Sequence, residues 1–278
     1  MYEVMVEDDG GRVRGDHQWT LGSAQRFFAR PQPAGEGEVL SARVDHDLQW
    51  RDVSFAVRPG LTGLATMVSG QERRVGVVLA HGGSDDGHRF FVDEAAQLAR
   101  RGATVVLPVT RLHPHAEIGE VAEVVRDAVL TELCAVDLLV GQVGPGARLC
   151  FLGHSAGGFL GAYLSALEPR LSRVAIFGYG VGTFTRLALH EIHRTGRALV
   201  DSDRKHLQWL EPTNYVQVDN ARQLMIQQGR YDTEVPMSEG RALFAAAVEP
   251  KRWAEYDCGH AIDADPRARA DRAAFVFA

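Results

Sequence analysis

The sequence predicts an α/β protein in which a mostly parallel sheet of about eight strands carries helices on both faces. Two observations lead to this class. Short apolar runs alternate with segments of helical periodicity over most of the chain, and strands that are apolar throughout are typical of a parallel sheet covered on both sides. A hairpin-like pair of strands precedes this series, so we expect a mixed sheet.

The first 47 residues are expected to form an N-terminal arm ahead of an α/β domain of residues 48–278. The arm is polar and rich in glycine, with one helix expected over about 19–29. Residues 50–57 then alternate between apolar and polar, as a half-buried strand does. Pro59-Gly60 marks a turn, and residues 61–68 are predicted to return as the second strand of the hairpin.

Strands and helices alternate along the rest of the chain. The predicted strands are the apolar runs 75–80, 103–107, 149–152, 174–177, 224–227 and 252–256, and helices are expected at about 90–101, 118–140, 156–167, 237–248 and 266–277. Residues 181–221 are long for a connection that holds one helix. We expect them to form a small cap, with helices near 184–194 and 203–210, over the C-terminal edge of the sheet; a long crossover is the alternative.

The motif Gly153-His154-Ser155-Ala156-Gly157 stands directly behind one of the apolar runs and before a helical segment. G-x-S-x-G at such a junction is the pattern of a nucleophile elbow, in which a sharp turn exposes the serine hydroxyl. Small residues flank the serine because the turn presses its neighbours against the helix and the strand. A chance match in a chain with 29 glycines is the alternative, and the position of the motif favours the elbow.

A nucleophilic serine needs a base and an orienting acid, and in this type of site both follow it along the chain. Asp232 stands in the loop after run 224–227, and His260 in the loop after run 252–256. Both therefore follow strand ends, where open α/β sheets gather their functional loops. We predict that Asp232 is the acid and His260 the base; Glu234 is the rival carboxylate, which we expect to cap a helix or to be solvated.

A fourth motif, His81-Gly82-Gly83, follows the apolar run 75–80. Acyl transfer builds an oxyanion that backbone N–H donors stabilise, and glycine permits the backbone angles that aim such donors at one point. We predict that Ala156 and Gly83 supply the donors, with Gly82 as the alternative to Gly83. A simple Gly-Gly turn is the structural alternative.

With these motifs the chain resembles the α/β hydrolases, and most of all the dienelactone-hydrolase-related serine esterases and peptidase-like hydrolases. The resemblance covers about residues 48–277, and it rests on His81-Gly82-Gly83, Gly153 to Gly158, Gly229-x-x-Asp232-x-x-Val235-Pro236 and Gly259-His260. It implies the α/β-hydrolase fold, the triad Ser155, Asp232 and His260, an oxyanion hole in the loop of residues 81–83, and no cofactor or metal.

The chain also departs from this pattern. Dienelactone hydrolases proper use a cysteine nucleophile, whereas Ser155 stands at that position here. Many relatives carry an aspartate and an Arg-Gly pair after the strand that corresponds to 103–107. This chain has Pro108-Val109-Thr110-Arg111 there, so its local loop and its specificity are expected to differ.

The motifs predict a hydrolase that cleaves a carboxylic ester, or a related acyl bond of a small molecule, through an acyl-enzyme on Ser155. Two alternatives stay open. The same triad supports acyl transfer, cyclisation or hydrolysis of a C–C bond in small-molecule metabolism, and the fold also occurs in ligand-binding proteins without activity.

Composition excludes other classes of function. A net charge of −6 without a basic stripe argues against nucleic-acid binding. No apolar run approaches the roughly 18 residues of a membrane span, and the first residues lack the pattern of a signal peptide. Three unpatterned cysteines are typical of the reducing cytoplasm, where we expect the protein. A homo-oligomer stays open.

Overall fold

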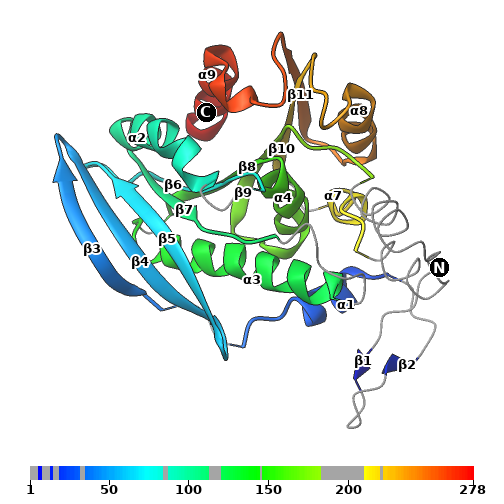
Figure 1. Ribbon diagram of the computed structural model, residues 1–278, viewed down its shortest axis with the longest axis horizontal. Coiled ribbons are helices and arrows are strands. Elements are labelled where there is room, and N and C mark those ends of the chain that lie inside the picture. The colour runs from blue at the N-terminus through cyan, green and yellow to red at the C-terminus, as the bar shows by residue number, and fades with distance from the viewer. Residues whose placement is uncertain are drawn as a thin grey trace.

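The computed structural model describes residues 6–7, 13–14, 19–31, 35–83, 87–112, 120–144, 146–182, 210–219 and 222–278. Among these residues, nine strands form one sheet in the order β11-β10-β9-β8-β6-β7-β5-β4-β3, with helices on either side of it (Figure 1). Two short strands, β1 (Val6–Glu7) and β2 (Val13–Arg14), pair with each other in antiparallel fashion. The α/β class predicted from the sequence is confirmed.

Six of the nine strands are parallel. They are β6 (Val75–Ala80), β7 (Ala103–Pro108), β8 (Arg148–His154), β9 (Leu171–Phe177), β10 (Gln223–Gly229) and β11 (Lys251–Tyr256). β6 and β7 are buried along their whole length. Strands covered on both faces have no solvent side, and this is why their sequences are continuously apolar.

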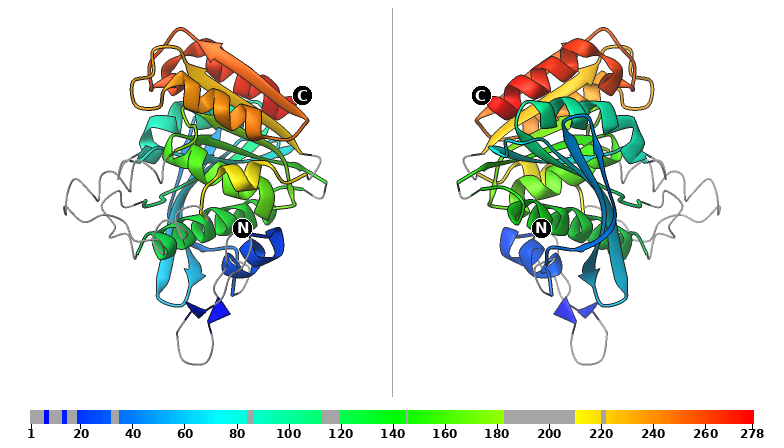
Figure 2. Two further views of the ribbon diagram at one scale, coloured as in Figure 1. Left: turned by 90° about the vertical axis from the view of Figure 1, so that its right-hand side faces the viewer. Right: turned by 90° about the vertical axis from the view of Figure 1, so that its left-hand side faces the viewer.

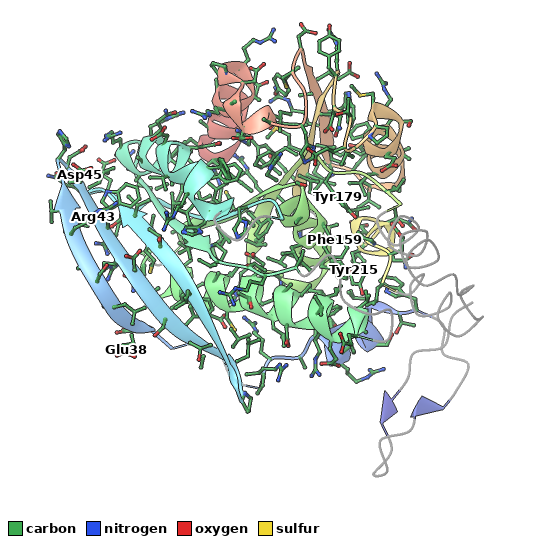
Figure 3. All side chains as sticks on the ribbon, in the orientation of Figure 1. Glu38, Arg43, Asp45, Phe159, Tyr179 and Tyr215 are labelled. Carbon is green, nitrogen blue, oxygen red and sulfur yellow. The ribbon has the colours of Figure 1, made fainter. Side chains whose placement is uncertain are left out.

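The remaining three strands, β3 (Glu38–Asp45), β4 (Leu48–Arg58) and β5 (Leu61–Ser69), are antiparallel, and β5 joins them to β7. The sheet has nine strands where the sequence predicts about eight, because residues 38–45, expected in the N-terminal arm, form β3. The physical reason is that β3 is exposed at every residue. It lies at the outer edge of the sheet, where Glu38, Arg43 and Asp45 are labelled in Figure 3, and it has no inward face to give an alternating pattern.

Helices cover both faces of the sheet, and the alternation of side chains along each strand separates two cores. Val77 and Leu79 of β6 face one core, which contains residues of α2 (Val92–Arg100) and α9 (Pro266–Phe277). Val78 of the same strand faces the other core, which contains residues of α3 (Val121–Val140), α4 (Ala156–Leu167) and α8 (Met237–Ala246). Figure 2 shows these layers from two opposite sides. Two short 3-10 helices, η1 (Gly87–Phe91) and η2 (Ile262–Ala264), precede α2 and α9.

An aromatic cluster on α4 holds two segments that are far apart in the sequence. Tyr163 of α4 lies 5.4 Å from Phe28, which follows α1 (Leu21–Phe27), and 4.2 Å from Tyr215 of α7 (Thr213–Val216), measured between ring centroids. The Tyr163 hydroxyl also donates to the backbone carbonyl of Leu210. Phe159, Tyr179 and Tyr215 are labelled in this region of Figure 3. The end of the expected cap therefore returns to the body of the protein on α4.

The expected cap helix 184–194 and most of the expected helix 203–210 lie outside the described residues. Helices predicted within the described parts match the structure closely, and α4 and α9 have the predicted bounds. Asp265 explains the start of α9, since its side chain accepts hydrogen bonds from the N–H groups of Arg267 and Ala268, ahead of a proline at the first helical position.

Candidate active site

Ser155 occupies a strained turn between β8 and α4. Its φ is +52° and its ψ is −112°, a backbone conformation that residues with a side chain rarely adopt. Such strain costs about 1–3 kcal/mol and persists only where surrounding contacts impose it. Here the Ser155 N–H donates to the carbonyl of Phe177 on β9 (2.9 Å), and the Ser155 carbonyl accepts from Phe159 N–H in α4 (3.0 Å).

The glycines around Ser155 are required by space. A Cβ on Gly153 would lie 2.2 Å from the carbonyl oxygen of Gly157, and a Cβ on Gly157 would lie 2.4 Å from that of Ala80. Both contacts are far inside van der Waals distance and involve backbone atoms, which cannot turn aside. The G-x-S-x-G spacing is therefore explained by how closely α4 approaches the ends of β8 and β6.

The structure brings Ser155, His260 and Asp232 into one hydrogen-bonded line. His260 Nε2 lies 3.0 Å from Ser155 Oγ, and His260 Nδ1 lies 2.9 Å from Asp232 Oδ2. The three residues follow β8, β11 and β10, so the C-terminal ends of parallel strands place them at one edge of the sheet.

The Asp232 carboxylate is buried, and both of its oxygens accept hydrogen bonds. Its side chain has no exposed surface. Oδ1 accepts from the backbone N–H groups of Glu234 (2.9 Å) and Val235 (2.8 Å), and Oδ2 accepts from Gln228 Nε2 (3.1 Å) as well as from His260. This arrangement fixes both the carboxylate and the imidazole that it contacts.

Glu234, the rival carboxylate, takes a different place. Its side chain is 70% exposed, and its Oε2 lies 3.6 Å from Nε2 of His260 rather than near Nδ1. It therefore faces the nitrogen that contacts Ser155, from the solvent side. The geometry favours Asp232 over Glu234 as the group that orients His260.

His154, to which the sequence assigns no role beyond its place in the G-x-S-x-G motif, supports the loop of His260. Its Nε2 donates to the backbone carbonyl of His260 (2.9 Å), and the two rings lie 4.9 Å apart between centroids. Burial is the main cause that lowers the pKa of His154 to about 4, so the ring is neutral at physiological pH. The available signal in the sequence was a polar side chain at the last position of a buried strand.

Gly82 and Gly83 pass beside the turn at Ser155. A Cβ built on Gly82 would lie 3.5 Å from Ser155 Cβ, and one built on Gly83 would lie 3.9 Å from Ala156 Cβ. The His81 carbonyl accepts from Gly157 N–H (2.8 Å), which ties this loop to the first turn of α4. Ala156 is the first residue of α4, where the helix itself provides no acceptor for the N–H. The predicted donors are thus neighbours around Ser155.

Other candidate groups are less suited to chemistry. Burial, with a smaller contribution from Asp265, raises the pKa of the Cys258 thiol, which disfavours the reactive thiolate.

Across the described ranges, no group of three or more histidine, cysteine or acidic residues is placed to hold a metal ion. No helix in those same ranges combines the length and apolar character needed to cross a bilayer.

Comparison with known proteins extends these observations. A model of the prolyl oligopeptidase family matches residues 137–274, which include Ser155, Asp232 and His260. No curated protein sequence matches the chain.

Solved structures resemble it along most of its length. An acetyl xylan esterase from Paenibacillus sp. R4 is 14% identical, over 92% of each chain, with a TM-score of 0.73. A protein from Klebsiella pneumoniae subsp. pneumoniae MGH 78578, assigned as a dienelactone hydrolase, is 13% identical, over 81% of this chain and 94% of its own, with a TM-score of 0.57. The α/β hydrolase GrgF from Penicillium sp. sh18 is 17% identical, over 80% of this chain and 95% of its own, also with a TM-score of 0.57.

Proposed function

Because the chain is an α/β hydrolase by fold, we propose that it cleaves carboxylic esters through an acyl-enzyme on Ser155. One observation carries the proposal: the hydrogen-bonded line from Ser155 Oγ through the ring of His260 to Asp232. A serine hydroxyl is a weak nucleophile until a base at hydrogen-bonding distance removes its proton, and His260 Nε2 stands at that distance.

In the proposed acylation step, Ser155 Oγ bonds to the carbonyl carbon while its proton passes to His260 Nε2. The electron pair of the C=O double bond moves onto oxygen, where the N–H groups of Ala156 and Gly83 stabilise the charge. Asp232 stabilises the imidazolium and keeps Nε2 directed at Ser155. The oxyanion then collapses, the bond to the alcohol oxygen breaks, and His260 donates the proton to the leaving alcohol.

Deacylation repeats these steps with water. His260 takes a proton from the water molecule, whose oxygen bonds to the acyl carbon. The second tetrahedral intermediate collapses, Ser155 Oγ leaves with the proton from His260, and the carboxylic acid is released.

A peptide or amide bond is the second candidate substrate, since the family model that matches residues 137–274 is that of the prolyl oligopeptidases. The esterases among the similar structures favour an ester. The two are separated by measuring kcat/KM for a p-nitrophenyl ester and a p-nitroanilide of the same acyl group. A preference for the anilide would identify a peptidase.

The proposal is tested by Ser155→Ala. We expect this variant to lose hydrolysis of p-nitrophenyl acetate and butyrate and to lose labelling by a fluorophosphonate probe. Ser172→Ala is the matched control, because Ser172 lies at the start of β9, at the opposite end of that strand from the site. Undiminished hydrolysis by Ser155→Ala, or labelling at another residue, would refute the assignment.

A further inference from the structure

The ring of His81 is held between two backbone groups. Its Nε2 accepts a hydrogen bond from the N–H of Thr110 (3.3 Å), and its Nδ1 contacts the carbonyl oxygen of Gly82. Since Nε2 accepts, the neutral ring carries its proton on Nδ1 and donates it to Gly82. Burial lowers the pKa of His81, which maintains this neutral form.

This contact fixes the direction of the next N–H group. In a trans peptide the carbonyl and the N–H point to opposite sides of the chain. The only cis peptide bond among the described residues precedes Pro250, so the Gly82–Gly83 bond is trans. Its carbonyl is directed at His81, and the N–H of Gly83, the proposed oxyanion donor, is therefore directed away from His81.

Thr110 connects His81 to a buried acid. Thr110 follows β7, and the Val109 N–H donates to the carbonyl of Leu64 on β5 (2.8 Å), which fixes the backbone there. The Thr110 hydroxyl donates to Oε1 of Glu132 in α3 (2.6 Å). Thr110 is thus hydrogen-bonded to Glu132 through its side chain and to His81 through its backbone N–H.

Glu132 has no exposed surface and lies on the buried side of α3 among residues of the core. Burying a carboxyl group is unfavourable unless it is hydrogen-bonded, and the Thr110 hydroxyl is the partner of Oε1 here, whereas Oε2 has no hydrogen-bonding partner among the described residues. Burial raises the pKa of Glu132 to about 8, so this group is mostly uncharged at neutral pH. The acid is therefore placed to serve as a fixed hydrogen-bonding anchor inside the core.

We propose that Thr110 and Glu132 are positioning residues of the oxyanion hole, acting through His81 on the Gly82–Gly83 peptide. This inference rests on the proposed function, because it presumes that Gly83 stabilises an oxyanion formed at Ser155. We expect neither residue to contact the substrate. They set the direction of one N–H donor, and donors stabilise a transition state only when they are aimed in advance.

The experiment compares two pairs of variants. Thr110→Val replaces the hydroxyl by a methyl group of similar size, whereas Thr110→Ser keeps the hydroxyl. Glu132→Met removes the acceptor, and Glu132→Gln keeps an oxygen in the same place. Each variant is measured for kcat and KM on p-nitrophenyl butyrate, and for binding of a butyl trifluoromethyl ketone and of the matching secondary alcohol. Ser155 Oγ adds to the ketone, its proton passes to His260, and the ketone oxygen becomes an oxyanion; the alcohol forms no such adduct.

We expect Thr110→Val and Glu132→Met to lower kcat and ketone affinity by a similar factor of about ten, since loss of a whole donor costs about 10²–10³-fold. KM and alcohol affinity stay unchanged, and Thr110→Ser and Glu132→Gln remain within about twofold of the wild type. The two losses do not add in the double variant, because both residues act through one contact.

Unchanged ketone affinity in Thr110→Val would overturn the inference, and so would an equal loss of ketone and alcohol affinity, which indicates a damaged pocket. Thr110→Val is decisive if Glu132→Met fails to fold. Ser155→Ala distinguishes failure of the proposed function from failure of the positioning role. If it stays active, the proposed function fails; if it is inactive while Thr110→Val equals the wild type, only the positioning role fails.

Discussion

The side chain of His154 donates a hydrogen bond to the backbone carbonyl of His260, 2.9 Å away, across 106 residues of sequence. The residue before the proposed nucleophile thus holds the loop of the proposed base. The two residues that must meet, Ser155 and His260, are coupled both by their direct contact and through this neighbouring ring.

This coupling predicts that His154→Leu lowers kcat by about 10- to 100-fold, because small displacements of a reacting group are costly. His154→Gln should keep most of the activity, since the glutamine amide nitrogen takes a position similar to that of Nε2. The measurement is kcat together with the rate of fluorophosphonate labelling. Equal activity in the two variants would show that the hydrogen bond does not position His260.

The assignment of the acid predicts that Asp232→Asn lowers kcat by about 10⁴-fold, because an amide in place of the carboxylate stabilises the wrong tautomer of the histidine. Glu234→Gln is the matched carboxylate control, and it should stay within about threefold, as expected for an exposed carboxylate whose charge is screened by solvent. Measuring kcat of both variants on one ester decides which carboxylate orients His260. A larger loss in the Glu234 variant would reverse the assignment.

Burial of Glu132 predicts how stability depends on pH. Its pKa in the folded protein is about 8, above the usual value of 4.5. Between these values the folded state keeps a proton that the unfolded chain releases, so stability falls as pH rises from 4.5 to 8. Relative to Glu132→Gln, the wild type should lose on the order of 4 kcal/mol of unfolding free energy between pH 5 and pH 9, measured by urea unfolding. A constant difference between the two proteins would contradict the prediction.

The close approach of α4 predicts that Gly157→Ala destabilises the protein by more than about 2 kcal/mol, since overpacking against backbone forces a shift of the helix. Gly141→Ala is the control, because Gly141 caps α3 in ordinary helical geometry and an added Cβ would meet its nearest atom at 3.6 Å. The melting temperatures of the two variants are measured by thermal unfolding and compared with that of the wild type. Equal melting temperatures would mean that the turn at Ser155 accommodates a Cβ at position 157 without a shift of α4.

Most of the fold follows from the sequence because the parallel strands are buried on both faces, and burial leaves an unbroken apolar run for each. The grouping of Ser155, Asp232 and His260 follows from the same topology, since each stands just past a strand end. β3 escaped prediction because an edge strand exposed at every residue carries no pattern.

The supporting contacts were harder to predict. Glu132 interrupts the apolar side of α3 at helical spacing, which signals a buried acid, but its partner Thr110 comes from another element, 22 residues away. The partner of His154 is a backbone carbonyl, which no sequence pattern identifies. Contacts of this kind depend on how the elements pack, and periodicity describes only single elements.

Whether Ser155 carries an acyl group is decided by stopping the hydrolysis of p-nitrophenyl butyrate with acid and locating the adduct by mass spectrometry. The good leaving group makes acylation fast, so the intermediate should accumulate. We expect a butyryl group on the peptide that contains Ser155, together with a burst of p-nitrophenol that matches the amount of protein. A butyryl group on a different residue, or steady hydrolysis without burst or adduct, would contradict this expectation.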